Sequence, residues 1–212
     1  MKFFSKLSAL GAVLVLTTAF ASADTIQLGS YGTNDTPTGA NSALVFAGTP
    51  STTYDIGTGG TWTNPVGTSS WVSQNTGNYP GGGNVEPFGI YSFSSTFTLA
   101  NDSYAGSIWV MADDTTDVLL NGHSVQVYDS GPNSTCQTGQ PNCRVPLLVT
   151  LPNGDFLTGL NTLTFAVHQT NGSSEGVDFS GSISSVPEPN SLILLGTGLL
   201  GAAGTLMRKM RS

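Results

Sequence analysis

The feature that most constrains the fold is an alternation of apolar and small polar side chains in the middle of the chain. In GIYSFSSTFTLA, the apolar residues Tyr91, Phe93, Phe97 and Leu99 are separated by serine and threonine. The segment NTLTFAVHQT repeats the pattern later in the chain. Because successive side chains of a β-strand point to opposite faces, a period of two predicts strands with one buried and one exposed face.

Further strands are predicted by the same pattern, separated by turn-forming residues. Asn121-Gly122 joins two of them and is a strong signal for a two-residue hairpin. Outside the two ends of the chain, no window of about 11 residues has helical periodicity. These features predict an all-β domain over residues 24–185, an antiparallel β-sandwich. The further strands are expected at Thr25–Leu28, Ala43–Ala47, Ser107–Ala112, Asp117–Leu120, Ser124–Tyr128, Leu147–Leu151 and Val177–Ile183.

Charge is scarce and unevenly placed, since charged residues make up 9% of the chain. Residues 24–186 contain twelve aspartates and glutamates and a single cation, Arg144, so their formal charge is −11. Binding to nucleic-acid phosphates requires clustered lysine and arginine, so no nucleic-acid partner is expected. A divalent cation or a neutral, hydroxyl-rich partner is more compatible with this negative charge. Arg144 is expected either to pair with a carboxylate or to contact a ligand.

The N-terminal segment, residues 1–23, has the three parts of a secretory signal peptide. Two lysines precede an apolar run from Leu7 to Phe20, and Ala21-Ser22-Ala23 supplies the small residues that signal peptidase requires. We expect cleavage before Asp24. The alternative is a buried N-terminal helix, against which the charge placement and the A-x-A ending both count.

At the other end, Ser191–Met207 is a run of 17 uncharged residues, at the short limit for crossing a bilayer core of about 30 Å. The basic residues Arg208, Lys209 and Arg211 follow at once and predict a cytoplasmic end for a transmembrane helix. Directly before this run stands Val186-Pro187-Glu188-Pro189, in which two prolines favour an extended backbone.

A V-P-E-P tetrapeptide, an apolar span and a basic tip, in this order, resemble the PEP-CTERM sorting signal. The resemblance covers residues 186–211, and Asn190 and Met210 depart slightly from the usual pattern. In that family an exosortase, a membrane-embedded cysteine transpeptidase-like protease of Gram-negative bacteria that make extracellular polysaccharide, reads the signal. It implies export through the inner membrane, transient anchoring, and processing near Pro187-Glu188-Pro189. The final site would be the cell surface or the extracellular matrix, and the alternative is a plain C-terminal anchor. Residues 186–212 are therefore assigned to the sorting signal.

A second resemblance concerns the domain itself. ADDTTDVLLNG, followed by LTGLNTLTFAV, resembles the "A-D-D…D-V-x-L-N-G" and "L-x-x-G-x-N-x-L-x-F-x-V" pattern of galactose-binding-like jelly-roll domains, although Gly159 stands one place nearer Asn161. The resemblance covers roughly residues 60–184 and mostly involves turn and core positions. It implies that Asp117 and Val118 begin the strand leading to Asn121-Gly122. It says little about function, because this kind of fold carries many functions.

A candidate metal site is formed by Asp113, Asp114 and Asp117, which cluster with Asn121. Hard oxygen ligands at a turn suit Ca²⁺, although the spacing is not that of an EF-hand. The alternative is that these residues are present because their side chains stabilise turns.

The two cysteines, Cys136 and Cys143, bracket a Gly-, Pro- and Asn-containing loop. In an exported protein they predict a short disulfide, whereas a zinc site lacks ligands at a useful spacing.

Candidate carbohydrate contacts are Trp62, Trp71 and Tyr79, which lie in polar, Gly-rich sequence and are expected at the surface, where flat rings suit sugar faces. Trp109, inside a predicted strand, is expected in the core. The histidines, His123 and His168, are expected to be ordinary surface residues.

Three functions remain open from the sequence. The first is a non-enzymatic exported protein that binds extracellular polysaccharide, with or without Ca²⁺. The second is a purely structural matrix or adhesion protein without a ligand site. The third is a polysaccharide-active hydrolase, for which the sequence offers no G-x-S-x-G motif and no recognisable pair of catalytic carboxylates. The sequence favours the first function, with no catalytic residue.

Overall fold

In the computed structural model, Thr25–Glu188 forms one compact unit, separate from the two ends of the chain. The predicted signal peptide at 1–23 and most of the predicted membrane helix lie outside the described residues. Within the described part of the chain, no helix has the length and apolar character needed to cross a membrane. The structure describes residues 24–32, 45–46, 53–128, 139–170 and 172–186, with 196–198, 200, 201, 203, 207 and 208 near the C-terminus.

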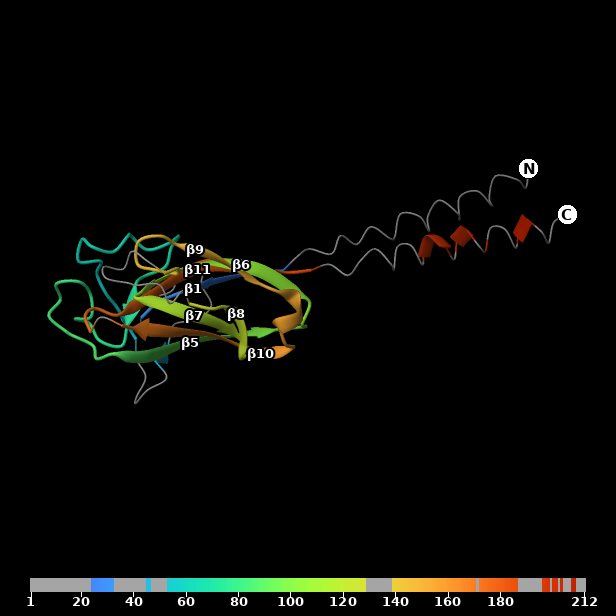
Figure 1. Cartoon of the computed structure of the whole chain (residues 1–212). Helices are drawn as coiled ribbons and strands as arrows, with labels where there is room; N and C mark the ends of the chain where they lie inside the picture. Colours follow the sequence, from blue (N-terminus) through green and yellow to red (C-terminus); the bar gives the residue numbers. More distant parts are fainter. Residues whose placement is uncertain are drawn as a thin grey trace. The chain divides into compact units, whose positions relative to one another are not determined.

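The compact unit consists of two antiparallel sheets, which confirms the predicted all-β sandwich (Figure 1). Sheet A has six strands in the order β3-β4-β11-β6-β9, with β1 also paired to β11. Sheet B has five strands in the order β2-β5-β10-β7-β8. The strands of sheet A are β1 (Thr25–Gly29), β3 (Tyr54–Asp55), β4 (Val72–Ser73), β6 (Tyr104–Asp113), β9 (Leu147–Leu151) and β11 (Gly176–Ser185). Those of sheet B are β2 (Val45–Phe46), β5 (Gly89–Leu99), β7 (Thr115–Leu120), β8 (His123–Gln126) and β10 (Gly159–Gln169), and a short 3-10 helix, η2, covers Asn153–Asp155.

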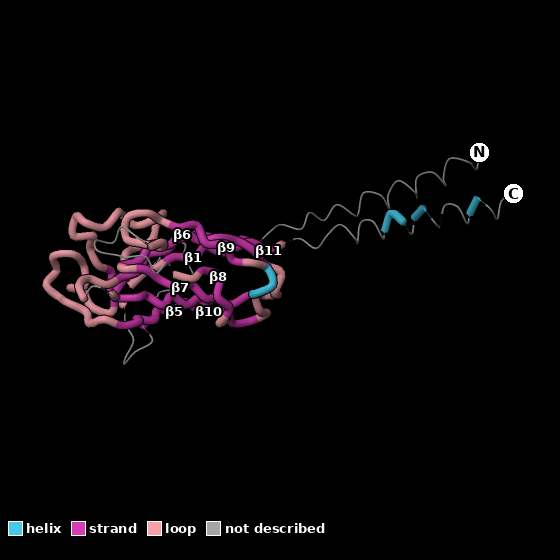
Figure 2. The backbone as a smooth tube through the Cα atoms, viewed as in Figure 1, coloured by secondary structure: helices cyan, strands magenta, loops and turns pink. Residues whose placement is uncertain are grey.

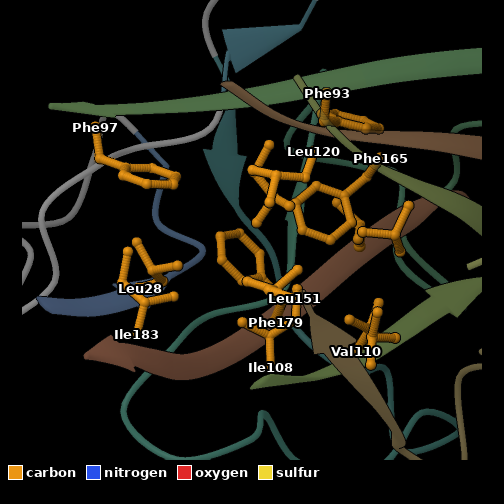
Figure 3. Close-up of a cluster of buried hydrophobic side chains, with 14 of the residues drawn as sticks. Leu28, Phe93, Phe97, Ile108, Val110, Leu120, Leu151, Phe165, Phe179 and Ile183 are labelled. Carbon is orange, nitrogen blue, oxygen red and sulfur yellow. The ribbon is translucent and has the colours of Figure 1, made fainter. Parts of the chain in front are cut away.

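The two-residue alternation places the core between the sheets. Along β5 and β10 every second side chain is buried, and Phe93 lies directly opposite Phe165. The ring of Phe165 from sheet B meets that of Phe179 from sheet A, with centroids 4.5 Å apart (Figure 3). Burial of each such ring stabilises the fold by about 1.5–3 kcal/mol, which is why these positions fix the register of the strands.

The hairpin at Asn121-Gly122 is confirmed, and both residues have positive φ angles, 53° and 85°. Two positive φ angles in succession are typical of the turn that matches the twist of a two-residue hairpin. The Asn121 side chain donates to Asn161 Oδ1 over 2.8 Å and accepts from the Thr162 backbone over 2.9 Å. Asn161 is fully buried and also donates to the Leu157 carbonyl over 2.7 Å. The two asparagines of the jelly-roll resemblance therefore tie β7 and β10 together.

The chain enters and leaves the sandwich at the same end, here called the terminal end. Thr25, the first residue of β1, pairs with Ser184 of β11, and their hydroxyl oxygens lie 2.9 Å apart. Immediately after β11, the Val186 N–H donates to the Ser103 carbonyl over 2.7 Å. The opposite end, here called the loop end, carries the long connections that gather on one side in Figure 2.

Candidate functional site

Trp62 and Trp71 are not at the surface, so the prediction that they form an exposed sugar platform is wrong. Both are buried with Met111 and Cys143 in a second hydrophobic cluster, here called the loop-end cluster. The two indole rings have centroids 4.4 Å apart with planes inclined at 33°. Met111 points outward from β6, and the segment between β3 and β4 folds back over it to bury this apolar surface. Tyr79 packs against the cluster and is half-buried, so its ring is not an open platform either.

Asp113 is a buried acid that anchors the loop-end cluster. The Trp62 indole N–H donates to Asp113 Oδ2 over 2.8 Å in a buried hydrogen bond. The pKa of Asp113 is raised to about 8, mainly by burial and also by the neighbouring Asp114 carboxyl, although the hydrogen bond from Trp62 opposes the rise. Asp113 Oδ1 has no hydrogen-bond partner among the described residues. Asp113 therefore holds a loop in place and faces no solvent.

Glu175 holds the next part of the same covering segment. The Ser73 hydroxyl donates to Glu175 Oε2 over 2.8 Å, and Asn78 Nδ2 donates to that hydroxyl over the same distance. All three residues are completely buried. The pKa of Glu175 is raised to about 8, mainly by burial and also by the charge of Glu86, although the hydrogen bond from Ser73 opposes the rise.

Asp178 is the third buried acid of this face. Its carboxylate accepts hydrogen bonds from the Val66 N–H over 2.8 Å, from the Ser30 hydroxyl over 3.1 Å and from the Ser69 hydroxyl. Burial raises the pKa of Asp178 to about 6, and the bonds from Ser69 and Val66 oppose that rise. Three acids therefore fasten the long segment at the loop end onto sheet A, a role that the sequence did not predict.

The predicted metal ligands Asp113, Asp114 and Asp117 do not form one site: the Asp113 and Asp114 carboxyl groups are neighbours, but Asp117 lies apart from them. Asp114 Oδ2 accepts from both the backbone N–H and the hydroxyl of Thr170, each over 2.6 Å. Asp117 points to the outer face of sheet B, where it pairs with His168. Across the described ranges, no group of three or more His, Cys, Asp or Glu side chains has the arrangement of a metal site. The Ca²⁺ prediction at these residues is therefore corrected: each carboxylate is taken up by a different structural partner.

His168 is not an ordinary surface residue as predicted. Its side chain is 14% exposed, its Nε2 lies 2.9 Å from Asp117 Oδ2, and the Tyr128 ring stacks on it at 3.9 Å. The Tyr128 backbone N–H also donates to Asp117 Oδ1 over 2.8 Å. His123, in contrast, is exposed as predicted and lies 3.8 Å from Asp155.

Trp109 lies on the outer face of sheet A, so its predicted place in the core is also wrong. It is 46% exposed, and Leu148, directly opposite on β9, is 47% exposed. On the other side Trp109 is paired with Ser180 of β11. Hydroxyl side chains of the same strands surround this apolar pair, and no charged residue belongs to the set. We call this surface the Trp109 shelf, formed by Ser107, Trp109, Leu148, Thr150, Ser180 and Ser182.

The cysteine prediction is partly supported. Cys143 is disulfide-bonded and fully buried. Cys136, the other cysteine of the sequence, lies outside the described residues. The pairing of Cys136 with Cys143 stays a prediction.

The chain is a β-sandwich protein whose sheet A exposes a partly apolar surface, the shelf, that contains no charged residue. Residues 185–209 match the model of the PEP-CTERM protein-sorting motif, so the chain carries this motif directly after β11. No curated protein matches the sequence. Among solved structures the chain is similar to a family 35 carbohydrate binding module from Clostridium thermocellum, with 13% identity over 76% of this chain and 98% of that one, and a TM-score of 0.33. It is also similar to the CBM36-1 domain of a multidomain xylanase from the hindgut metagenome of Trinervitermes trinervoides, with 12% identity over 70% and 100% of the two chains, and a TM-score of 0.33.

Proposed function

We propose that this chain is an exported protein that binds a neutral extracellular polysaccharide through the Trp109 shelf without transforming it. We further propose that an exosortase processes its C-terminus after export through the inner membrane of a Gram-negative bacterium. The protein then remains at the cell surface or in the extracellular matrix. The PEP-CTERM motif supports the delivery, and the shelf supports the binding.

The observation that carries the binding proposal is the exposure of Trp109 on the outer face of sheet A. An indole ring is large and amphipathic, and leaving it half exposed forgoes much of the free energy that burial would supply. Leu148 extends the apolar area across to β9, and the hydroxyls of Ser180 and Thr150 border it. An apolar face with hydroxyls around it suits a sugar ring, which has apolar C–H faces and a polar periphery.

Charge supports a neutral ligand. The domain has a formal charge of −11 between residues 24 and 186, so a polyanionic glycan would meet repulsion at ordinary ionic strength. The shelf itself carries no charge, and hydroxyl groups both donate and accept hydrogen bonds. A polysaccharide without carboxylate or sulfate groups is therefore the partner that this surface favours.

Binding rather than turnover is supported by where the acids lie. Glycoside hydrolysis needs two carboxyl groups that flank the scissile bond. Asp113, Glu175 and Asp178 are buried and occupied with loop anchoring, and none belongs to the shelf. A ligand that lies on the shelf would meet hydroxyls and apolar side chains, which hold a sugar but do not cleave it.

The place of the sorting motif supports processing close to the folded domain. The Val186 N–H is still bonded to Ser103 at the end of β11, so the motif follows the sandwich without an intervening linker. Cleavage near Pro187-Glu188-Pro189 would leave β11 intact, because β11 is held by β1 on one side and by β6 on the other.

The test is a binding titration of the full-length protein, purified in mild detergent, against neutral polysaccharides (dextran, xylan, galactan and mannan) and against alginate as an acidic control. We expect saturable binding to at least one neutral member, weakened about tenfold or more by Trp109→Ala. Thr98→Ala, at an exposed position of β5 in sheet B, is the control away from the shelf and should bind normally. If the folded protein binds none of the neutral polymers, the structural matrix function replaces this proposal.

A further inference from the structure

A second surface feature lies next to the shelf, between the outermost strands of the two sheets. It is a hollow of about 460 Å³ between the end of β8 and the start of β9. Sites for small molecules generally have volumes of about 300–1,000 Å³, so this hollow has the size of a ligand site. Its described lining residues are Gln126, Val127, Gly139, Gln140, Asn142, Val145 and Leu147.

The chemistry of the lining is neutral. Three of its described lining residues carry side-chain amides, three are aliphatic, and none of the described lining residues is charged. Asn142 Oδ1 accepts from the backbone N–H groups of Arg144 and Val145, over 3.0 and 2.9 Å. No described residue accepts a hydrogen bond from Asn142 Nδ2, and the Gln140 amide has no partner among the described residues. Side-chain amides both donate and accept hydrogen bonds, so these groups suit an uncharged ligand rich in hydroxyl groups.

The wall of the hollow is held in place before any ligand arrives. The Asn142 carbonyl accepts from the Ala112 N–H over 3.3 Å, and the Cys143 carbonyl accepts from the Thr63 N–H over 3.0 Å. Cys143 is buried in the loop-end cluster and disulfide-bonded. A fixed wall lowers the entropic cost of ordering a binding site, which favours affinity.

The hollow and the Trp109 shelf are neighbours across a single strand. Leu147 and Leu148 are consecutive residues of β9, so their side chains point to opposite faces: Leu148 belongs to the shelf and Leu147 lines the hollow. Neighbouring strands are about 5 Å apart, a distance that an extended polysaccharide can span. A chain lying across the shelf therefore meets the hollow where it passes over β9.

We propose that this hollow is a second subsite that binds one neutral sugar unit of the same polysaccharide, through Asn142 Nδ2 and the Gln140 amide. The inference rests on the proposed function. The shelf would hold the polysaccharide through apolar contacts, and the hollow would select among neutral sugars. Amides can distinguish the direction of a hydroxyl, whereas an indole face accepts most sugars.

The test measures the affinity of the full-length protein for dextran, xylan, galactan and mannan in four variants. Asn142→Asp keeps the Oδ1 acceptor that holds the Arg144 and Val145 N–H groups but replaces the free donor, and Gln140→Ala removes an exposed amide. We expect each to weaken the preferred polymer about three- to tenfold and to change the order of preference among the four. Trp109→Ala should weaken binding to all four polymers. Thr98→Ala, on the outer face of sheet B, should change nothing, and an unfolding curve is measured for every variant.

Each result has a separate meaning. Unchanged affinity and preference in Asn142→Asp and Gln140→Ala, together with a loss in Trp109→Ala, would overturn the subsite and leave the shelf standing. A loss in the two amide variants with normal binding in Trp109→Ala would retain the hollow and reject the shelf. Absence of binding to all four polymers by the folded wild-type protein would reject both.

Discussion

Trp109 and Leu148 face each other across β6 and β9 on the outer face of sheet A, each close to half exposed. Directly opposite residues of an antiparallel pair lie about 4.5–5.5 Å apart, so the two side chains form one continuous apolar surface. Exposed apolar surface of this kind, bordered by polar residues, commonly marks an interaction site. Packing alone gives no reason for the exposure of this apolar pair.

Leu148→Asn should separate binding from stability. It removes one of the two apolar side chains of the shelf and leaves both buried hydrophobic clusters unchanged, so we expect a several-fold loss of affinity for the preferred neutral polysaccharide. The free energy of unfolding should change by less than about 1 kcal/mol. Parallel titration and urea unfolding measure the two quantities. A large loss of stability with unchanged affinity would mean that Leu148 belongs to the core.

Trp62→Ala should behave in the opposite way. It empties a buried site beside Trp71 and removes the hydrogen bond to Asp113, so we expect a loss of about 3–5 kcal/mol in the free energy of unfolding. Trp62→Phe should cost less, because it fills most of the site. Thermal or urea unfolding measures the change, with Trp109→Ala as the exposed control. A Trp62→Ala protein with wild-type stability and weakened glycan binding would show that Trp62 is an exposed glycan contact, as the sequence predicted.

Three of the buried acids predict an unusual pH dependence. Burial raises the pKa of Asp113 and of Glu175 to about 8 and that of Asp178 to about 6. A carboxyl group whose pKa is higher in the folded protein binds its proton more tightly there, so the folded state holds more protons between the unfolded and folded pKa values. The free energy of unfolding should therefore fall as the pH rises from about 4 to about 8.

Urea unfolding at a series of pH values between 4 and 9 checks this prediction. Glu175→Gln and Asp113→Asn do not ionise, so each should flatten the upper part of the profile if the variant folds. A wild-type protein that gains stability between pH 5 and pH 8 would show that these carboxyl groups are ionised in the fold.

The disulfide prediction concerns both connectivity and stability. Mass spectrometry of the exported protein after alkylation should find no free thiol and a single bridge between Cys136 and Cys143. Closing a loop of this length stabilises a fold by about 2 kcal/mol through the unfolded state, so reduction should lower the midpoint of unfolding. Recovery of both cysteines in alkylated form would contradict the prediction.

Processing of the tail is checked on the protein recovered from its native host. The intact mass should correspond to a chain that begins at Asp24 and ends near Pro187-Glu188-Pro189, without Arg208, Lys209 and Arg211. Replacing Glu188 by alanine should leave the tail attached. A mature protein that retains the basic tail would identify a permanent anchor.

The sequence predicted most of the fold because apolar and small polar residues alternate regularly along the long strands. Phe93 and Phe165 occupy the buried phase of β5 and β10, and Asn121-Gly122 forms the expected hairpin. The strands β3 and β4 were missed, since two-residue strands carry no period.

The candidate site was predicted less well, and Trp109 shows why. It lies in the segment SIWVMA, where residues of both strand faces are apolar. Alternation therefore does not show which face is buried. The structure resolves this: Ile108 and Val110 point inward, Met111 is covered by the loop-end cluster, and Trp109 is left outside. Trp62 and Trp71 were misplaced for the converse reason, because their polar, Gly-rich surroundings form tight turns over an apolar patch that only the fold assembles.

The most direct test of the central claim uses the tryptophan fluorescence of the full-length protein. The chain has three tryptophans, of which Trp62 and Trp71 are buried and Trp109 is exposed. Acrylamide should therefore quench mainly Trp109, and a saturating neutral polysaccharide that binds the shelf should protect it. We predict that this protection disappears in Trp109→Phe, which retains an aromatic face but not the indole signal. Saturable binding that leaves the quenching of Trp109 unchanged would contradict the account and place the glycan on another surface of the sandwich.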